Sequence, residues 1–332
     1  MTNAIAPEIT EESGYTHQTL GQQLYLPTAT SRQILARQKK INYDTQRDPE
    51  KDKEKIRMHT NMINPQEVEE AATYFDATSV GYDAEFSDSS IWSIAHRTGR
   101  TLLEQALDER TGLDIADIGC GTGKWAGFFS GRASSLLLSD VAESMLAVAV
   151  RKFAHVPSVQ SLRASVDDLG HISDASFDLV LCMGDPLSYA PDYVRGISEL
   201  CRITRPGGLI FVSVDSRLGY LRILKEQHHA DLDTLFTFLE TGNIIGWEGL
   251  PLHAFTTKEL GDLFAEAGAE TLSIHSLPSA SAYFLFDDRF REQIHDPRQF
   301  ERLIAMEDLL RDQGSPGPHH LYGLFKKALP GG

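Results

Sequence analysis

A glycine-rich segment, DIGCGTG, runs from Asp117 to Gly123 directly after a short apolar stretch. An apolar run that ends in alternating glycines is typical of a strand entering a tight turn, because glycine tolerates positive φ and lets a ligand approach the backbone. The spacing disfavours two nucleotide-binding loops. A dinucleotide fingerprint requires its third glycine where Lys124 stands, and a P-loop requires a glycine and a hydroxyl residue where Ile118 and Trp125 stand. The segment therefore predicts a ligand-binding loop that suits neither NAD nor ATP.

An acidic residue follows the next apolar stretch. Asp140 closes the run Ser135–Ser139, about 20 residues after Gly119. In a βαβ unit, an acid at the tip of the second strand lies beside the ribose of a bound nucleoside, where its two oxygens accept from both hydroxyls. Asp140 also precedes a helical run, Ala142–Phe153, and can act as a helix cap. The two roles are compatible.

Apolar stretches alternate with helical patterns over most of the chain beyond residue 65. The predicted strands are nearly continuous in apolar residues, which favours a parallel sheet covered by helices on both faces. We expect seven strands, at Leu113–Ile118, Ser135–Ser139, Val159–Ala164, Phe177–Met183, Gly208–Asp215, Glu270–Leu277 and His320–Lys327. Helices are expected at Gln66–Phe75, Trp125–Ser130, Ala142–Phe153, Tyr193–Ile203, Thr257–Ala267 and Arg298–Arg311.

Two further segments follow this order of elements. The sequence SFDLVLCMGDPLSY spans 176–189, and RITRPGGLIFVSV spans 202–214. Together with the glycine-rich segment, they resemble motif I, the fourth-strand motif and the turn into the fifth strand of the class I S-adenosylmethionine (SAM) dependent methyltransferases. The resemblance covers most of residues 70–328. It implies an α/β fold with a Rossmann-like, seven-stranded, mostly parallel sheet, SAM as the cofactor, and methyl transfer as the activity.

The resemblance also implies which residues hold SAM. In motif I an acidic residue and three glycines wrap the methionine end of the cofactor, whose ammonium group suits an acidic loop. A tyrosine in the helix before the sheet covers the cofactor, and Tyr82 matches it, although this aromatic side chain could equally pack the helix onto the sheet. The implied cofactor-binding set is Tyr82, Asp117, Gly119, Gly121, Gly123, Asp140, Val141, Met145, Ser165, Val166, Met183 and Gly184.

One position departs from the family pattern. The family places an aspartate after the third strand to read the adenine amino group, and this chain has Ser165 there. Backbone groups of Ser165 and Val166 could bind adenine instead, or Asp167 could do so if the loop is shifted. The residue that reads adenine is therefore left open.

Methyl transfer requires alignment of donor and acceptor and, for an oxygen or nitrogen acceptor, removal of a proton. Ligands of open parallel sheets lie beyond the carboxyl ends of the strands, so the acceptor should approach over the tips of the fourth and fifth strands. The segment 215–256 is long for a connection and is expected to cover the acceptor as a lid. His253 in this segment is the first candidate for a base and Asp185 the second. The alternatives are a surface histidine and an aspartate that caps a turn.

Composition limits the partners. A formal net charge of −16 argues against nucleic acid, which is bound largely through Lys and Arg. The sequence shows no export signal and no apolar run long enough to span a membrane, and three unpaired cysteines fit a cytoplasmic protein. Adjacent histidines, His228 with His229 and His319 with His320, point to different faces of an element, so a metal is not predicted.

Residues 1–64 are expected to form a helical extension to the methyltransferase domain at 65–328. Its charged part, 32–57, is either a solvated face or an arm that acts as a lid or forms a homodimer. The resulting hypothesis is methyl transfer to an N, O or C atom of a small-molecule acceptor in specialised or secondary metabolism. Two alternatives remain: a methyltransferase of a peptide or carrier-tethered intermediate docked by the basic arm, and a non-catalytic SAM-binding scaffold.

Overall fold

The central sheet of the computed structural model has seven strands in the order β3-β2-β1-β4-β5-β9-β8. Strands β1 to β5 pair in parallel, and β9 runs antiparallel to both β5 and β8. The bounds are β1 Leu113–Ile118, β2 Ala133–Asp140, β3 Val159–Arg163, β4 Phe177–Cys182, β5 Thr204–Asp215, β8 Ala269–Leu277 and β9 His320–Lys327. The predicted seven-stranded, mostly parallel sheet is confirmed. The structure describes residues 65–85, 91–156, 158–226, 230–246, 248–279, 295–312 and 320–331.

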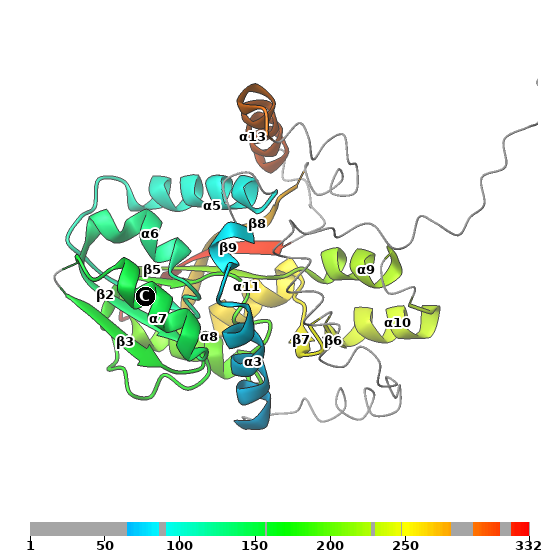
Figure 1. The fold of residues 1–332 in the computed structure, drawn as a ribbon, viewed down its shortest axis with the longest axis horizontal. Helices are drawn as coiled ribbons and strands as arrows, with labels where there is room; N and C mark the ends of the chain where they lie inside the picture. The colour runs from blue at the N-terminus through cyan, green and yellow to red at the C-terminus, as the bar shows by residue number, and fades with distance from the viewer. Residues whose placement is uncertain are drawn as a thin grey trace, which may run out of the picture.

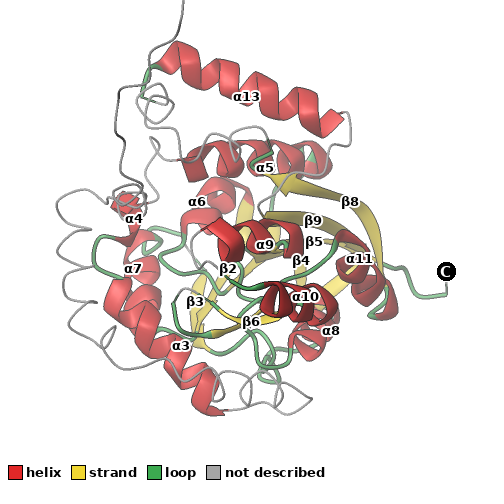
Figure 2. Cartoon of the chain, turned by 90° about the vertical axis from the view of Figure 1, so that its right-hand side faces the viewer, coloured by secondary structure: helices red, strands yellow, loops and turns green. Residues whose placement is uncertain are grey.

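Helices cover both faces of this sheet (Figures 1 and 2). On one face, α5 Ile91–Leu107, α6 Lys124–Phe129 and α7 Glu143–Lys152 bury apolar side chains such as Leu103 and Phe129 against the strands. On the other face, α8 Tyr193–Ile203 and α11 Thr257–Glu266 pack Leu200 and Phe264 against the sheet. The central strands β1, β4 and β5 are therefore buried on both sides, which explains their nearly continuous apolar residues, whereas the edge strands β3 and β8 are largely exposed or half-buried.

The strand order places a switch point between β1 and β4. The chain continues from β1 outward to β2 and β3, then crosses back to β4 on the other side of β1. The helices that follow β1 and β4, α6 and α8, consequently lie on opposite faces of the sheet, and ligands of open α/β sheets bind at such a switch point. The glycine-rich segment follows β1, so topology and motif indicate the same place.

Helix α5 was not predicted, and the strand β5 begins at Thr204 rather than at Gly208. Glycine within a helix lowers its propensity, and α5 contains Gly99. A Cβ at Gly99 would lie 2.8 Å from the ring of Tyr322 in β9, so the glycine permits close packing of helix on sheet. At β5, the pairing shifts register between Thr204 and Leu209, which brings the Pro-Gly-Gly turn into the strand as an irregularity.

The lid segment after β5 folds into its own small unit. It contains α9 Arg217–Glu226, α10 Leu232–Thr241 and a two-stranded sheet of β6 Asn243–Ile245 and β7 Pro251–His253 (Figure 1). Tyr220, Phe238 and Leu252 form its apolar centre. The unit rejoins the main sheet where the amide of Phe255 donates to the carbonyl of Asp215 at 2.8 Å.

The remaining described helices are α3 Pro65–Thr78, α4 Tyr82–Glu85 and α13 Pro297–Asp312. None of the helices within the described ranges combines the length and apolar character that crossing a membrane requires. The predicted extension at 1–64, with the basic arm at 32–57, lies outside the described residues, as do His228, His229, Trp247 and His319.

Candidate functional site

The glycine-rich loop leaves β1 in a left-handed conformation. Gly119, Gly121 and Gly123 have φ angles of 69°, 53° and 82°, which side chains with a Cβ rarely adopt. The loop is tied to the next strand because the amide of Cys120 donates to the carbonyl of Ser139 at 2.8 Å. The three glycines are therefore required by the backbone itself.

The three glycines face different surroundings. A Cβ at Gly119 would lie 2.2 Å from Cγ of Pro186, and a Cβ at Gly123 would lie 2.6 Å from the ring of Phe153. A Cβ at Gly121 would meet only a ring atom of Tyr82, at 3.9 Å, among the described atoms. Gly119 and Gly123 thus allow protein to pack against the loop, whereas Gly121 borders space that a ligand can fill.

Asp140 joins this loop to the end of β2. Its Oδ2 accepts from the amide of Gly121 at 2.7 Å, and its Oδ1 accepts from the amide of Ala142 at 2.8 Å. The residue is 7% exposed, and burial raises the pKa of its carboxyl group. The backbone of Val141 also hydrogen-bonds to this carboxylate, which has about four lone-pair sites and so can still accept from a further donor such as a ribose hydroxyl.

Asp117, the acid of the glycine-rich segment, lies buried beneath the loop. Its Oδ2 accepts from the amide of Ala126 at 2.9 Å, while Oδ1 has no hydrogen-bond partner among the described residues. Burial raises the pKa of Asp117 to about 7. The hydrogen bond from Ala126 lowers this pKa, and the negative charge of Asp140 raises it further. A buried carboxylate oxygen without a donor fits a cationic ligand, and the ammonium group of SAM is such a ligand.

Helix α4 is held over the loop by ionic contacts. Thr122 Oγ1 donates to Asp83 Oδ1 at 2.6 Å, and Lys152 Nζ contacts the Asp83 carboxylate and the Thr122 carbonyl. These contacts keep Tyr82 near Gly121. Sequence reasoning predicted Tyr82 but missed Asp83 and Lys152, because only the folded chain brings α4 and α7 together.

Other residues of the predicted cofactor-binding set stand after β2, on α7 and after β4. Met145 on α7 and Met183 after β4 are buried, and the carbonyl of Val141 accepts from Arg163 Nε at 2.9 Å. Gly184 has φ 85°, and a Cβ there would meet no described atom within 4 Å. The loops after β1, β2 and β4 thus converge.

The loop after β3 is the predicted adenine region. The carbonyl of Ser165 accepts from the amide of Asp168 at 3.0 Å, which forms a tight turn, and Val166 is buried against α8. Asp167 is fully buried, and its Oδ2 accepts from the amide of Asp192 at 3.1 Å. Asp167 Oδ1 is buried and has no hydrogen-bond partner among the described residues, so the adenine contact stays open between the backbone of Ser165 and Val166 and the side chain of Asp167.

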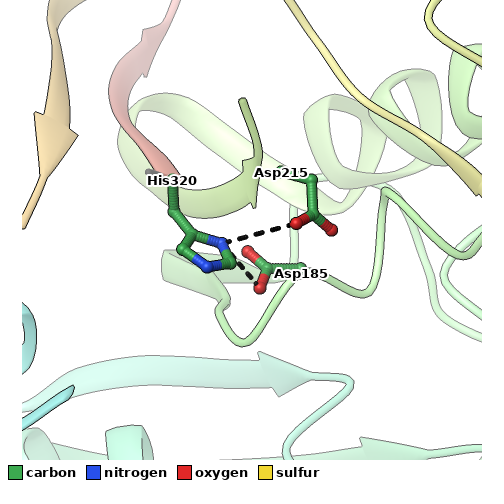
Figure 3. A group of neighbouring side chains, drawn as sticks. All are labelled: Asp185, Asp215 and His320. Carbon is green, nitrogen blue, oxygen red and sulfur yellow. Dashed lines mark ion pairs between the residues drawn. The ribbon is translucent and has the colours of Figure 1, made fainter. Parts of the chain in front are cut away.

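Three side chains meet beside the β4 loop. His320 Nδ1 lies 3.0 Å from Asp185 Oδ2 and 3.9 Å from Asp215 Oδ1 (Figure 3). Burial lowers the pKa of His320, but the charges of Asp185 and Asp215 outweigh it and raise that pKa to about 9. Burial, reinforced by the Asp185 charge, raises the pKa of Asp215. Asp185 was a predicted catalytic residue, whereas His320 was considered only as one of two adjacent histidines.

His253, the first predicted base, lies in a different environment. Its Nδ1 is 2.6 Å from Asn243 Oδ1, its Nε2 is 3.0 Å from Glu259 Oε1, and its ring stacks on Tyr193 at 4.1 Å. The side chain is almost completely buried, and both ring nitrogens have protein partners. These contacts suit a histidine that ties β7 to β6 and α11, and they disfavour a base that must reach the acceptor.

Comparisons with known proteins agree with this geometry. Residues 115–208 match a family model described as a methyltransferase domain. The demethylmenaquinone methyltransferase of Shouchella clausii is 27% identical over 192 residues, which cover 54% of this chain and 80% of that protein. That of Staphylococcus aureus strain MRSA252 is 29% identical over 136 residues, which cover 40% of this chain and 55% of that protein.

A solved structure has the same fold. It is a chain from the complex between the Haloferax volcanii Trm112 methyltransferase activator and the putative methyltransferase, with a TM-score of 0.51 at 19% identity. The match covers 77% of this chain and 98% of that one.

Sheet order, glycine loop and matching domain together define the class I, Rossmann-like methyltransferases. Residues 115–208 thus form a methyltransferase domain, and the similarity to known methyltransferases supports a SAM-dependent enzyme with SAM as its cofactor.

Proposed function

We propose that the enzyme transfers the methyl group of SAM to a nucleophilic atom of a small-molecule acceptor. The main support for this proposal is the pair of carboxylates at the glycine-rich loop. Asp140 accepts a hydrogen bond from the amide of Gly121, and Asp117 has a buried oxygen without a hydrogen-bond donor among the described residues. Asp117 then attracts the ammonium group, and Asp140 accepts from the ribose hydroxyls. In-line transfer needs little more from the protein than alignment and exclusion of water.

The glycine loop holds the methionine part of SAM in this proposal. Val141 and Met145 border the nucleoside. The backbone of Ser165 and Val166, or the side chain of Asp167, reads adenine. Tyr82 covers the cofactor, and Met183 and Gly184 lie on the side where the acceptor approaches. The open position at Gly184 supports that assignment, because the backbone there leaves room for a ligand.

The acceptor side is rich in carboxylates. Asp185 and Asp215 lie next to Gly184, and Tyr189 donates to Glu248 Oε1 at 2.9 Å nearby. Burial raises the pKa of Glu248 to about 7. Such surroundings favour an acceptor that brings an ionisable O–H or N–H group. The sequence relatives are named for a quinone acceptor, demethylmenaquinone, so quinones in their reduced, hydroxylated form are among the acceptors to test. Of the two predicted catalytic residues, Asp185 is the better placed.

A two-stage experiment tests the proposal. Calorimetry with S-adenosylhomocysteine (SAH) on the full chain should give binding at one site, and release of SAH from SAM should then be measured with reduced naphthoquinones, catechols and amines. Lack of SAH binding by correctly folded protein would overturn the proposal. Binding without turnover of any acceptor would favour a non-catalytic scaffold, and turnover only of carrier-bound substrates would favour the tethered-substrate alternative.

The basic arm at 32–57 is central to that alternative, and a role for it remains a prediction, as does participation in specialised metabolism. Deletion of residues 1–64 separates the possibilities. Loss of activity on tethered but not on free acceptors would assign the arm to docking, whereas a change from dimer to monomer in solution would assign it to dimerisation.

A further inference from the structure

Three strands bring one ligand atom each to a common point. Asp185 follows β4, Asp215 ends β5, and His320 begins β9, where it lies directly opposite Asp215 in the antiparallel register. The three ligand atoms all lie within 4.8 Å of one another, and Figure 3 shows the side chains pointing toward a shared centre. Asp215 and His320 stand at paired strand ends, and Asp185 lies in the turn that follows β4.

We propose that Asp185, Asp215 and His320 form a binding site for a divalent transition-metal ion. Zinc–ligand bonds to nitrogen and carboxylate oxygen are about 2.1 Å long, so two ligand atoms on one ion are about 3.0 Å apart at a right angle and about 4.2 Å apart in opposite positions. The distances of 3.0 and 3.9 Å from His320 Nδ1 to the two carboxylates fall in this range. Two of the three ligand–ligand distances thus already suit an ion, and the carboxylate oxygens of Asp185 and Asp215 lie within 4.8 Å of each other.

Two buried carboxylate oxygens next to the cluster support a cationic ligand. Asp185 Oδ1 and Glu248 Oε2 are both inaccessible to solvent and have no hydrogen-bond partner among the described residues. Buried carboxylates are normally paired with cations or coordinate metals, because an ionised carboxylate without a partner is costly in a protein interior. Protonated His320 is one cation beside these carboxylates, and a divalent metal ion that takes the place of its Nδ1 proton would bring additional positive charge.

The ligand set indicates which ions suit the site. One imidazole and two carboxylates are borderline to hard donors, which favour Mn²⁺, Fe²⁺ or Zn²⁺ over ions that prefer sulfur. Three protein ligands leave coordination positions open for water or for an oxygen of the acceptor. Contact between the ion and the acceptor rests on the proposed function, whereas metal binding itself does not.

The test measures metal binding directly. The 332-residue chain is treated with a chelator, dialysed and titrated with MnCl₂. Bound Mn²⁺ is followed by electron paramagnetic resonance, and ZnCl₂ is then added as a competitor. We expect one Mn²⁺ per chain, displaced by Zn²⁺, and at least 10-fold weaker binding in Asp215→Asn and in His320→Gln. Asp174→Asn is the matched control, because Asp174 is an exposed carboxylate paired with Arg202 outside the cluster, and its affinity should not change.

Folding is checked by circular dichroism, and Asp185→Asn serves as a further variant if Asp215→Asn or His320→Gln unfolds. The proposal is wrong if the wild-type protein binds no Mn²⁺ or Zn²⁺ at millimolar concentration, or if the folded cluster variants bind as well as the wild type. SAH binding is measured on the same samples. Normal SAH binding without metal binding would therefore remove this inference and leave the proposed function in place.

Discussion

The amide of Gly121 donates a 2.7 Å hydrogen bond to Asp140 Oδ2, which connects the loop after β1 to the end of β2. The same carboxylate accepts from Ala142 at the start of α7. The residue proposed to hold the ribose and the loop proposed to hold the methionine part of SAM are thus fixed relative to each other before the cofactor binds. Such preorganisation reduces the ordering that binding must impose.

Asp140→Ala should weaken SAH binding by at least 10-fold. The substitution removes the acceptor for the ribose hydroxyls and leaves the amide of Gly121 without its partner, and a hydrogen bond to a charged group contributes about 1.5–3 kcal/mol. Isothermal titration calorimetry measures the change, with Asp174→Ala as a surface control. Equal affinities in wild type and Asp140→Ala would contradict the assignment of Asp140.

Gly119→Ala should destabilise the fold. The new Cβ would lie 2.2 Å from Pro186 Cγ on a residue with φ 69°, so the β4 loop must move, and overpacking of this kind costs about 1–3 kcal/mol. Urea unfolding measures the loss. Gly131→Ala is the control, since a Cβ there meets no described atom within 4 Å and its φ is not left-handed. Similar stabilities of the two variants would show that the contact with Pro186 is unimportant.

Gly121→Ala should affect ligand binding more than stability. A Cβ there has room, so the folded state bears mainly the cost of φ 53°, about 1–2 kcal/mol. The methyl group would, however, enter the space proposed for SAM, and we expect a loss of SAH affinity of more than 10-fold in a protein that still unfolds cooperatively. The reverse pattern, with normal affinity and a large loss of stability, would place the cofactor elsewhere.

The contrast between these glycines shows what the sequence could predict. The loop, the acid at Asp140 and all seven strands were predicted because they depend on short-range patterns of glycine and apolar residues. The sequence could not place His320 next to Asp185 and Asp215. That contact depends on the antiparallel pairing of β9 with β5, two strands that lie far apart along the chain. No sequence pattern indicated that both ring nitrogens of His253 are engaged by the protein, because their partners stand on β6 and α11 and meet only in the folded chain.

His253→Gln should lower stability without changing the pH dependence of kcat/KM. The imidazole contacts Asn243 and Glu259 and stacks on Tyr193, and removing one partner from a buried hydrogen-bond network costs about 1–3 kcal/mol. Thermal unfolding and a pH–rate profile of the variant test this expectation. His171→Gln, at an exposed histidine, is the control for stability. If His253→Gln kept its stability but lost a titrating limb of the profile, His253 would be the base after all.

The affinity for SAH should rise with pH between about 5.5 and 7. Burial raises the pKa of Asp117 from 3.8 to about 7, so below pH 7 the free protein holds this carboxyl group mainly in its neutral form, which attracts an ammonium group poorly. Binding of the cation favours the charged form, and the dissociation constant should therefore fall as pH rises, approaching tenfold per unit well below pH 7.

Folding stability shows the opposite trend. The folded state binds the proton more tightly than the unfolded chain, so the contribution of Asp117 is greatest below pH 3.8 and is lost as pH rises through 7. Calorimetry and urea unfolding across this range, on wild type and Asp117→Asn, separate the effect from other titrations. A wild-type affinity as independent of pH as that of the variant would mean that Asp117 does not face the ammonium group.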